Sequence, residues 1–103
     1  MKANVYFTRE ITPEKVVELY RALGVELPGK VAVKVHSGEK GNQNFLRPEF
    51  WRPMVEAVHG TVVECNTAYG DAAGGVRDHT ESHRRLLEEH GWTKYFNVDL
   101  MDA

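Results

Sequence analysis

The chain contains 103 residues, of which 42% are apolar and 27% are charged, a composition typical of one globular domain with a single hydrophobic core. Thirteen basic and fifteen acidic side chains give a formal net charge of −2, which excludes a strongly basic surface for nucleic acid or anionic membranes. The one cysteine, Cys65, excludes an intramolecular disulfide and any cysteine-cluster metal site made by this chain alone.

The N-terminal residues MKANVYFTREI contain neither the continuous apolar stretch nor the small-residue cleavage site of a secretory signal. No segment approaches the roughly 18 consecutive apolar residues of a membrane-spanning helix. The sequence therefore predicts a cytoplasmic protein without membrane association. The final run, YFNVDLMDA, has the pattern of a strand that stops close to the last residue. We expect residues 1–103 to form a single domain that is the N-terminal portion of a longer protein.

The first two predicted elements are a strand and a helix. Val, Tyr and Phe side chains favour a short strand over Ala3–Phe7. Thr12 followed by Pro13 indicates a helix start, since threonine caps helix N-termini and proline is tolerated at the first helical position. Apolar residues then recur at helical spacing, and Gly24 ends the helix.

A second strand and a second helix follow. Val31–Val35 is a nearly continuous apolar run, typical of a strand whose two faces are both covered, and Lys34 is its exception. After a polar loop, Pro48 can open the helix. Pro53 removes a backbone donor inside it, and would therefore either kink the helix or delay its start to about Arg52.

The β-branched run Thr61–Cys65 predicts a third strand. A second long connection leads to a helix, for which Asp78 and Glu81 resemble a capping box and Gly91 provides the stop. Tyr95–Val98 predicts a fourth strand.

These elements alternate as β-α-β-α-β-α-β, with about four strands and about three helices. This alternation predicts an α/β fold with a mostly parallel sheet, either complete in itself or a fragment of a larger α/β domain. The carboxyl ends of parallel strands meet at one edge, where ligands usually bind. Two long polar loops, 36–47 and 66–78, follow strands and are therefore expected at that edge.

The end of the second predicted strand and the loop after it contain the residues that we predict to be catalytic. Lys34 could stabilise negative charge on a ligand, or simply extend from an edge strand into solvent. His36, on the same strand face, could be a general base, a metal ligand or a hydrogen-bonded structural residue. Glu39 could bind a ligand or pair with Lys34 or Arg47. Asn42 could bind the ligand or satisfy loop backbone groups.

The second polar loop would form the opposite wall of the same site. Its predicted ligand-binding residues are Asn66, Thr67, Tyr69 and Arg77. The asparagine and the threonine could equally satisfy loop backbone groups, and Arg77 could pair with Glu81. No segment matches the glycine-rich patterns G-x-x-x-x-G-K-[ST] or G-x-G-x-x-G, so a nucleotide site of either kind is not predicted.

His79 and His83 are four residues apart in a predicted helix and would therefore share a face. Together with His36 or Asp78 they could bind a metal ion. The glutamate lies at the third rather than the second position, so the pattern is not the H-E-x-x-H of zinc proteases. The alternative is a helix whose buried face simply begins with two histidines.

The pattern K-x-H-x-G-E-x-G-N, which begins at Lys34 and is followed by Arg47 and Pro48, carries a family resemblance. With the later segments CNTAYG and HGW, over roughly residues 30–92, it resembles the N-terminal part of domain-of-unknown-function family 362. These proteins are commonly described as uncharacterised iron–sulfur centre proteins. The resemblance implies an α/β fold within a longer parent protein, in which a separate ferredoxin-like segment often supplies the cluster cysteines.

The preferred interpretation is a domain of an iron–sulfur-associated protein that contributes an anionic-ligand or cofactor pocket at the carboxyl edge of its sheet. In a redox role, Lys34 and Arg77 would neutralise ligand charge while His36 moves a proton. One alternative is a non-catalytic interaction or assembly module, whose partner is the remainder of the parent protein, a ferredoxin-like segment or a second copy. The other is a mononuclear metal-binding domain that uses His79 and His83. Within this chain we expect no cofactor, because the cluster would be held elsewhere.

Overall fold

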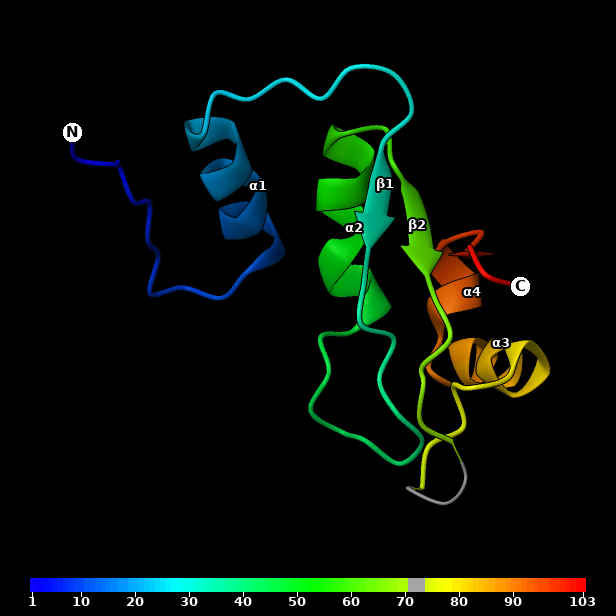
Figure 1. Ribbon diagram of the computed structural model, residues 1–103. Coiled ribbons are helices and arrows are strands. Elements are labelled where there is room, and N and C mark those ends of the chain that lie inside the picture. Colours follow the sequence, from blue (N-terminus) through cyan, green and yellow to red (C-terminus); the bar gives the residue numbers. More distant parts are fainter. Residues whose placement is uncertain (71–73) are drawn as a thin grey trace.

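Three short parallel strands form the sheet in the computed structural model, which describes residues 1–70 and 74–103 (Figure 1). Within these residues the strands, hydrogen-bonded in this order, are β1 (Ala32–Lys34), β2 (Thr61–Glu64) and β3 (Asp99–Leu100). Lys34 is in register with Val63, and Val63 with Asp99, so one row of residues crosses the whole sheet. The predicted α/β class with a parallel sheet is confirmed.

Helix α1 (Pro13–Ala22) begins where its sequence predicts. The Thr12 hydroxyl oxygen accepts a hydrogen bond from the backbone N–H of Lys15 at 3.2 Å. Pro13 occupies the first helical position, where a backbone N–H would have no partner in the helix. The helix packs beside α2 (Pro48–Ala57), as Figure 1 shows, and is joined to the sheet by the segment around Gly24.

Helix α2 begins at Pro48 and contains Pro53 in its interior. The alternative start near Arg52 is therefore wrong. Val55 is buried and Trp51 packs on the same core cluster, so the apolar face of the helix is anchored on both sides of the proline. This packing offsets the one backbone hydrogen bond that the proline cannot make.

Helix α3 (Thr80–Glu89) stops just before Gly91, the predicted stop, which has a φ of +81°. Its N-cap is His79, whose side chain makes no capping hydrogen bond. The predicted capping box that starts at Asp78 is therefore wrong. Part of the preceding connection, residues 71–73 of the second polar loop, lies outside the described residues.

A short helix, α4 (Trp92–Tyr95), stands where the fourth strand was expected to begin. The Trp92 side chain is fully buried, and its indole N–H donates to the carbonyl oxygen of Ser37 at 3.0 Å. Burial of this large side chain beneath the end of β1 favours a helical turn here. The strand predicted over Tyr95–Val98 is wrong, and β3 begins only at Asp99.

The strand predicted over Ala3–Phe7 is also wrong, since these residues form no regular structure. Val5 is 87% exposed and Phe7 is 79% exposed, so the apolar side chains have no sheet to cover. A strand needs a hydrogen-bonded neighbour to be stable, and none of the described strands pairs with this segment. Residues 1–70 and 74–103 thus contain three strands and four helices, in place of about four strands and about three helices.

The core lies between one face of the sheet and helices α2, α3 and α4. Val62 and Leu100 point into it from β2 and β3, Val35 from just after β1, and Leu87 and Trp92 from the helices. On the opposite sheet face Val63 is buried, whereas the residues around it are exposed: Ala32, Lys34, Thr61, Cys65 and Asp99. No helix formed by the described residues has the length and apolar character to span a bilayer.

Candidate functional site

The candidate site lies at the carboxyl edge of the sheet, where the loops that follow β1 and β2 run side by side (Figure 1). Its centre is Glu64, the last residue of β2, which is 1% exposed. The Oε1 atom accepts hydrogen bonds from Lys34 Nζ and, at 3.0 Å, from the backbone N–H of Cys65. The Oε2 atom accepts from the backbone N–H of Ser37 at 3.1 Å and from its hydroxyl at 2.8 Å.

These donors keep Glu64 ionised although it is buried. Burial alone raises the pKa of the carboxyl, but the hydrogen bonds from Lys34, Cys65 and Ser37 outweigh it and lower that pKa below its ordinary value. The Lys34 side chain is 53% exposed, and its ammonium also donates to the carbonyl oxygen of Val35 at 2.6 Å.

A second ion pair joins the two polar loops. Arg77 Nε donates to Glu39 Oε2 at 3.0 Å, and the backbone N–H of Val76 donates to Glu39 Oε1 at 3.0 Å. Burial raises the pKa of the Glu39 carboxyl, but these donors and the Lys40 N–H lower it to about 2. Burial likewise lowers the pKa of Arg77, while Glu39 and the Tyr69 hydroxyl raise it above its ordinary value.

His83, from α3, completes the network and is fully buried. Its Nε2 lies 3.1 Å from the Ser37 hydroxyl, and its Nδ1 lies 3.1 Å from Asn66 Oδ1. The Asn66 amide nitrogen donates to the Thr80 hydroxyl at 3.0 Å. Burial is the main cause that lowers the pKa of the imidazole, although Glu64 raises it. The network therefore includes residues from β1, β2, α3 and both loops.

The first loop is held by packing as well as by charge. The Ser37 carbonyl oxygen accepts hydrogen bonds from His90 Nδ1 at 2.9 Å and from the Trp92 indole. Gly38 has a φ of +84°, and a Cβ there would lie 2.5 Å from the Phe45 ring. Phe45 in turn stacks on His90 with ring centroids 4.5 Å apart. A side chain at position 38 would therefore displace the loop that presents Ser37.

The structure brings some of the predicted site residues together and leaves others apart. Glu39, Tyr69 and Arg77 form one cluster, and Lys34 joins it through Glu64. Asn66 binds His83 instead of facing open space.

The remaining predicted residues of the two walls make local contacts. Asn42 Oδ1 accepts from the Asn44 backbone, and the Thr67 hydroxyl donates to the carbonyl oxygen of Tyr69. His36 is exposed on the same face as Lys34, and its Nδ1 accepts from the Gly38 N–H at 3.2 Å.

The two histidines of the predicted metal site lie in unlike environments. His79 precedes α3 as its N-cap, and its side chain is 80% exposed. His83 is buried, with both ring nitrogens facing polar partners. Among residues 1–70 and 74–103, no group of three or more histidine, cysteine, aspartate or glutamate side chains is placed to hold a metal ion.

Sequence reasoning missed the central residues of the network. Glu64 was assigned no role, although a glutamate at the end of a β-branched, apolar strand is a signal that the sequence contains. His83 was considered as a metal ligand or as one of two histidines that begin the buried face of the helix, but no polar partner was assigned to it. Its position three residues before Leu86 places it on the buried face of α3, and this spacing could have identified it as a buried polar partner.

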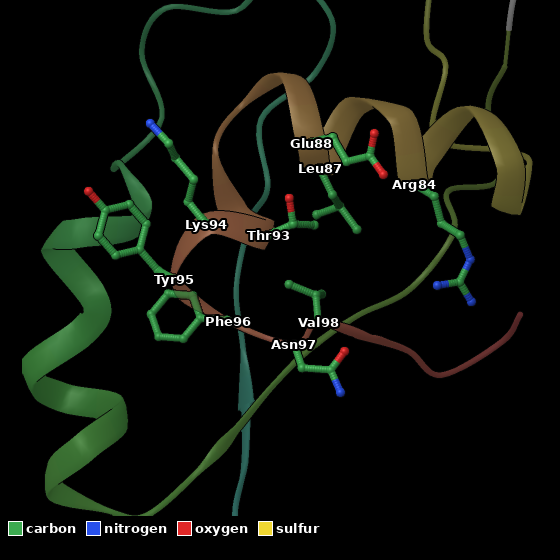
Figure 2. A pocket seen from close by; sticks show the side chains of 9 residues that line it. All are labelled: Arg84, Leu87, Glu88, Thr93, Lys94, Tyr95, Phe96, Asn97 and Val98. Carbon is green, nitrogen blue, oxygen red and sulfur yellow. The ribbon is translucent and has the colours of Figure 1, made fainter.

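An open cavity of about 420 Å³ lies away from the carboxyl edge, beside α3 and α4 (Figure 2). Leu87, Thr93 and Val98 lie near its centre in Figure 2, while the Arg84 and Lys94 side chains extend in opposite directions at its rim. It is lined by none of the predicted site residues. The shifted pKa values, in contrast, belong to the network around Glu64, apart from that of the exposed pair partner Lys15. We therefore place the candidate site at the carboxyl edge.

A comparison with protein families gives one match. The family described as a domain of unknown function, DUF362, matches residues 31–102, which include all three strands and the network around Glu64. No curated protein matches the chain, and no solved structure does.

Proposed function

This chain belongs to the DUF362 family, and from its geometry we propose that the domain binds a small anionic ligand, or the anionic group of a cofactor, at the carboxyl edge of its sheet. The carrying observation is Lys34, whose side chain is half-exposed and whose ammonium donates to the buried, ionised Glu64 and to the carbonyl oxygen of Val35. His36 is exposed on the same face and would contact the ligand beside it. The carboxyl edge of a parallel sheet is the usual ligand position in α/β folds.

The other charged residues of the network serve to hold Lys34 rather than to meet the ligand. Arg77 is only 5% exposed, and its guanidinium is already bound by Glu39 and Tyr69 and lies 3.6 Å from Glu64. Glu39, a candidate catalytic residue in the sequence, is in this proposal the residue that positions Arg77. In a reaction, Lys34 would stabilise negative charge and His36 would move a proton.

The proposal places the domain in an iron–sulfur-associated protein, as the family resemblance implies. The residues of this chain do not fit a cluster, because clusters are held by about four cysteine thiolates and the sequence contains only Cys65. A ferredoxin-like segment or another protein would have to supply those thiolates. We therefore derive no electron-transfer step from residues 1–103.

Titration with inorganic phosphate, followed by amide and side-chain NMR, tests the anion site. We expect saturable shifts at Lys34 and His36, and about a tenfold loss of affinity in Lys34→Gln, equivalent to about 1.4 kcal/mol. Lys30→Gln is the matched control, since Lys30 is exposed and precedes β1 at the opposite edge. His36→Ala, at an exposed position, should also weaken binding. Equal affinity in the Lys34→Gln and Lys30→Gln variants would contradict the proposal.

A second candidate function is an assembly module, and a partly exposed sheet face favours it. Parallel sheets are usually covered on both faces, yet Ala32, Thr61 and Asp99 are exposed here around the buried Val63. A second copy of the chain could cover this face. Sedimentation equilibrium would then show a dimer that Thr61→Arg dissociates, whereas a monomer at all concentrations would remove this candidate.

A further inference from the structure

The Ser37 hydroxyl lies between two groups that both need its single proton. Its oxygen is 2.8 Å from Glu64 Oε2 and 3.1 Å from His83 Nε2. The ionised carboxylate can only accept, so the hydroxyl donates to Glu64. His83 Nε2 must then carry a proton and donate to the serine oxygen.

The second ring nitrogen of His83 faces the side chain of Asn66. His83 Nδ1 faces Asn66 Oδ1, which can only accept, so this nitrogen must also carry a proton in the arrangement shown. A neutral imidazole has only one N–H. With Asn66 in this orientation, therefore, the hydrogen bonds are complete only when His83 is the charged imidazolium.

A neutral His83 is satisfied by turning the Asn66 amide over. The amide nitrogen would then donate to Nδ1, and the Thr80 hydroxyl, which accepts in the present orientation, would donate to the amide oxygen. Nε2 keeps its proton and its bond to Ser37 in both states. The same pocket therefore holds two complete hydrogen-bond networks that differ by one proton taken from water.

We propose that His83 stores a proton for the carboxyl-edge site, that its protonation is coupled to the orientation of the Asn66 amide, and that Ser37 and Glu64 link it to Lys34. The coupling of His83 to Asn66 stands on the hydrogen-bond geometry alone. The role of Lys34, which would connect this network to a bound ligand, rests on the proposed function.

Charged groups from every element around His83 decide how easily the proton is taken up. The anions that favour the imidazolium are Glu64 from β2, Glu39 from the first loop and Asp102 after β3. Arg77 from the second loop opposes it, as does burial. Lys34 acts through Glu64, because its ammonium neutralises part of the charge that would stabilise His83.

The arrangement of charges predicts how an anion bound at Lys34 changes the protonation of His83. An anion bound to Lys34 competes with Glu64 for the ammonium and so leaves more negative charge on the carboxylate. That charge favours the imidazolium at His83, whose Nε2 lies 4.0 Å from Glu64 Oε2. Ligand binding at the surface should therefore be accompanied by proton uptake in the buried network.

Long-range ¹H–¹⁵N NMR of the imidazole nitrogens in the full chain tests the proposal directly. In neutral His83 we expect the proton on Nε2, and the Asn66 side-chain amide signals should move with the same midpoint as the His83 titration. The exposed His59 serves as the internal control, with a titration that leaves the Asn66 signals unchanged. A neutral tautomer protonated at Nδ1, or Asn66 signals independent of His83, would overturn the coupling.

Two variants extend the test without requiring a ligand. Asn66→Asp should raise the His83 titration midpoint by roughly one pH unit, because the carboxylate accepts from Nδ1 in the imidazolium. Lys34→Gln should also raise it, whereas the control Lys30→Gln should not. If Lys34→Gln leaves the midpoint unchanged, the link to Lys34 is wrong. If phosphate fails to bind while these shifts occur, the anion site is wrong and the proton coupling holds.

Discussion

Glu64 carries a charge into a position that is 1% exposed, and the surrounding donors explain how the fold accommodates it. Four hydrogen bonds, two from Ser37 and one each from Lys34 and Cys65, replace the water that the carboxylate loses. Such a group is costly when any one donor is removed, because the remaining charge is left incompletely solvated. Removal of the Ser37 hydroxyl or of the Lys34 ammonium should therefore destabilise the fold.

The second carboxylate of the network, the partly buried Glu39, provides a prediction about pH. Its folded-state pKa is about 2, below the ordinary 4.5, so its stabilising effect is complete above pH 4.5 and is lost as the pH falls toward 2. Glu39→Gln should lower the free energy of unfolding by about 1–3 kcal/mol at pH 7. Urea unfolding at pH 7 and near pH 2 measures the difference from the wild type, which should shrink at the lower pH.

The control for that measurement is Glu26→Gln, because Glu26 is exposed in the segment after α1. This variant should stay within about 0.5 kcal/mol of the wild type at both pH values. An equal loss of stability in Glu39→Gln at pH 7 and near pH 2 would contradict the assigned ion pair with Arg77.

A comparison of alanine variants at two glycines of the first loop distinguishes the cost of backbone strain from that of a side-chain collision. Gly38 and Gly41 have φ angles of +84° and +77°, so alanine is strained at both. At Gly38 the added Cβ also meets the Phe45 ring at 2.5 Å, whereas at Gly41 it meets nothing within 4 Å. Thermal unfolding should show a loss of about 1 kcal/mol in Gly41→Ala and at least about 2 kcal/mol in Gly38→Ala. Equal losses would mean that Phe45 does not pack on the loop.

At the scale of elements, local sequence predicted the helices better than the strands. Thr12 and Pro13 carry a complete start signal within two residues, and the structure uses it. The run Tyr95–Val98 reads as a strand by composition, but the burial of Trp92 just before it favours a helix. Ala3–Phe7 has strand-forming side chains and no neighbouring strand. Both errors have one cause, since packing partners distant in sequence decide these segments.

Prediction of the candidate site from the sequence is limited in the same way, by contacts between residues distant in the chain. The shared edge of the two loops follows from strand and helix order alone, and the contact of Glu39 with Arg77 is consistent with it. Which side chains point inward does not follow, because Ser37 and His83 depend on the approach of α3 to β1. The polar residues of the two loops therefore located the site at the carboxyl edge of the sheet, but they did not identify the buried residues at its centre.

Helix α2 offers a prediction at this scale. Pro53 lies in its interior and cannot donate to the carbonyl oxygen one turn earlier. Pro53→Ala should therefore stabilise the protein by about 1 kcal/mol or more, measured by urea unfolding. Pro48→Ala should not, because the first helical position needs no donor and the Pro48 side chain is fully buried. A destabilised Pro53→Ala would indicate that its ring packing against α1 outweighs the missing bond.

At the scale of the whole molecule, the stabilising contacts are concentrated between the sheet and three helices. The core cluster takes its buried residues from the range 35–100 and none from α1 or the segment before it. The matched family region, residues 31–102, coincides with this range. The buried core and the buried polar network thus occupy the same part of the chain, and α1 packs mainly against α2.

Removal of residues 1–10 tests this division. Val5 and Phe7 are largely exposed, so their loss uncovers little apolar surface elsewhere, and Thr12 remains to cap α1. The free energy of unfolding should change by less than about 0.5 kcal/mol, since exposed side chains contribute little. Urea unfolding measures it, with Val62→Ala as the core reference that should lose about 2 kcal/mol or more, because Val62 is 1% exposed. A truncated chain as unstable as Val62→Ala would mean that the N-terminal segment packs on the fold in solution.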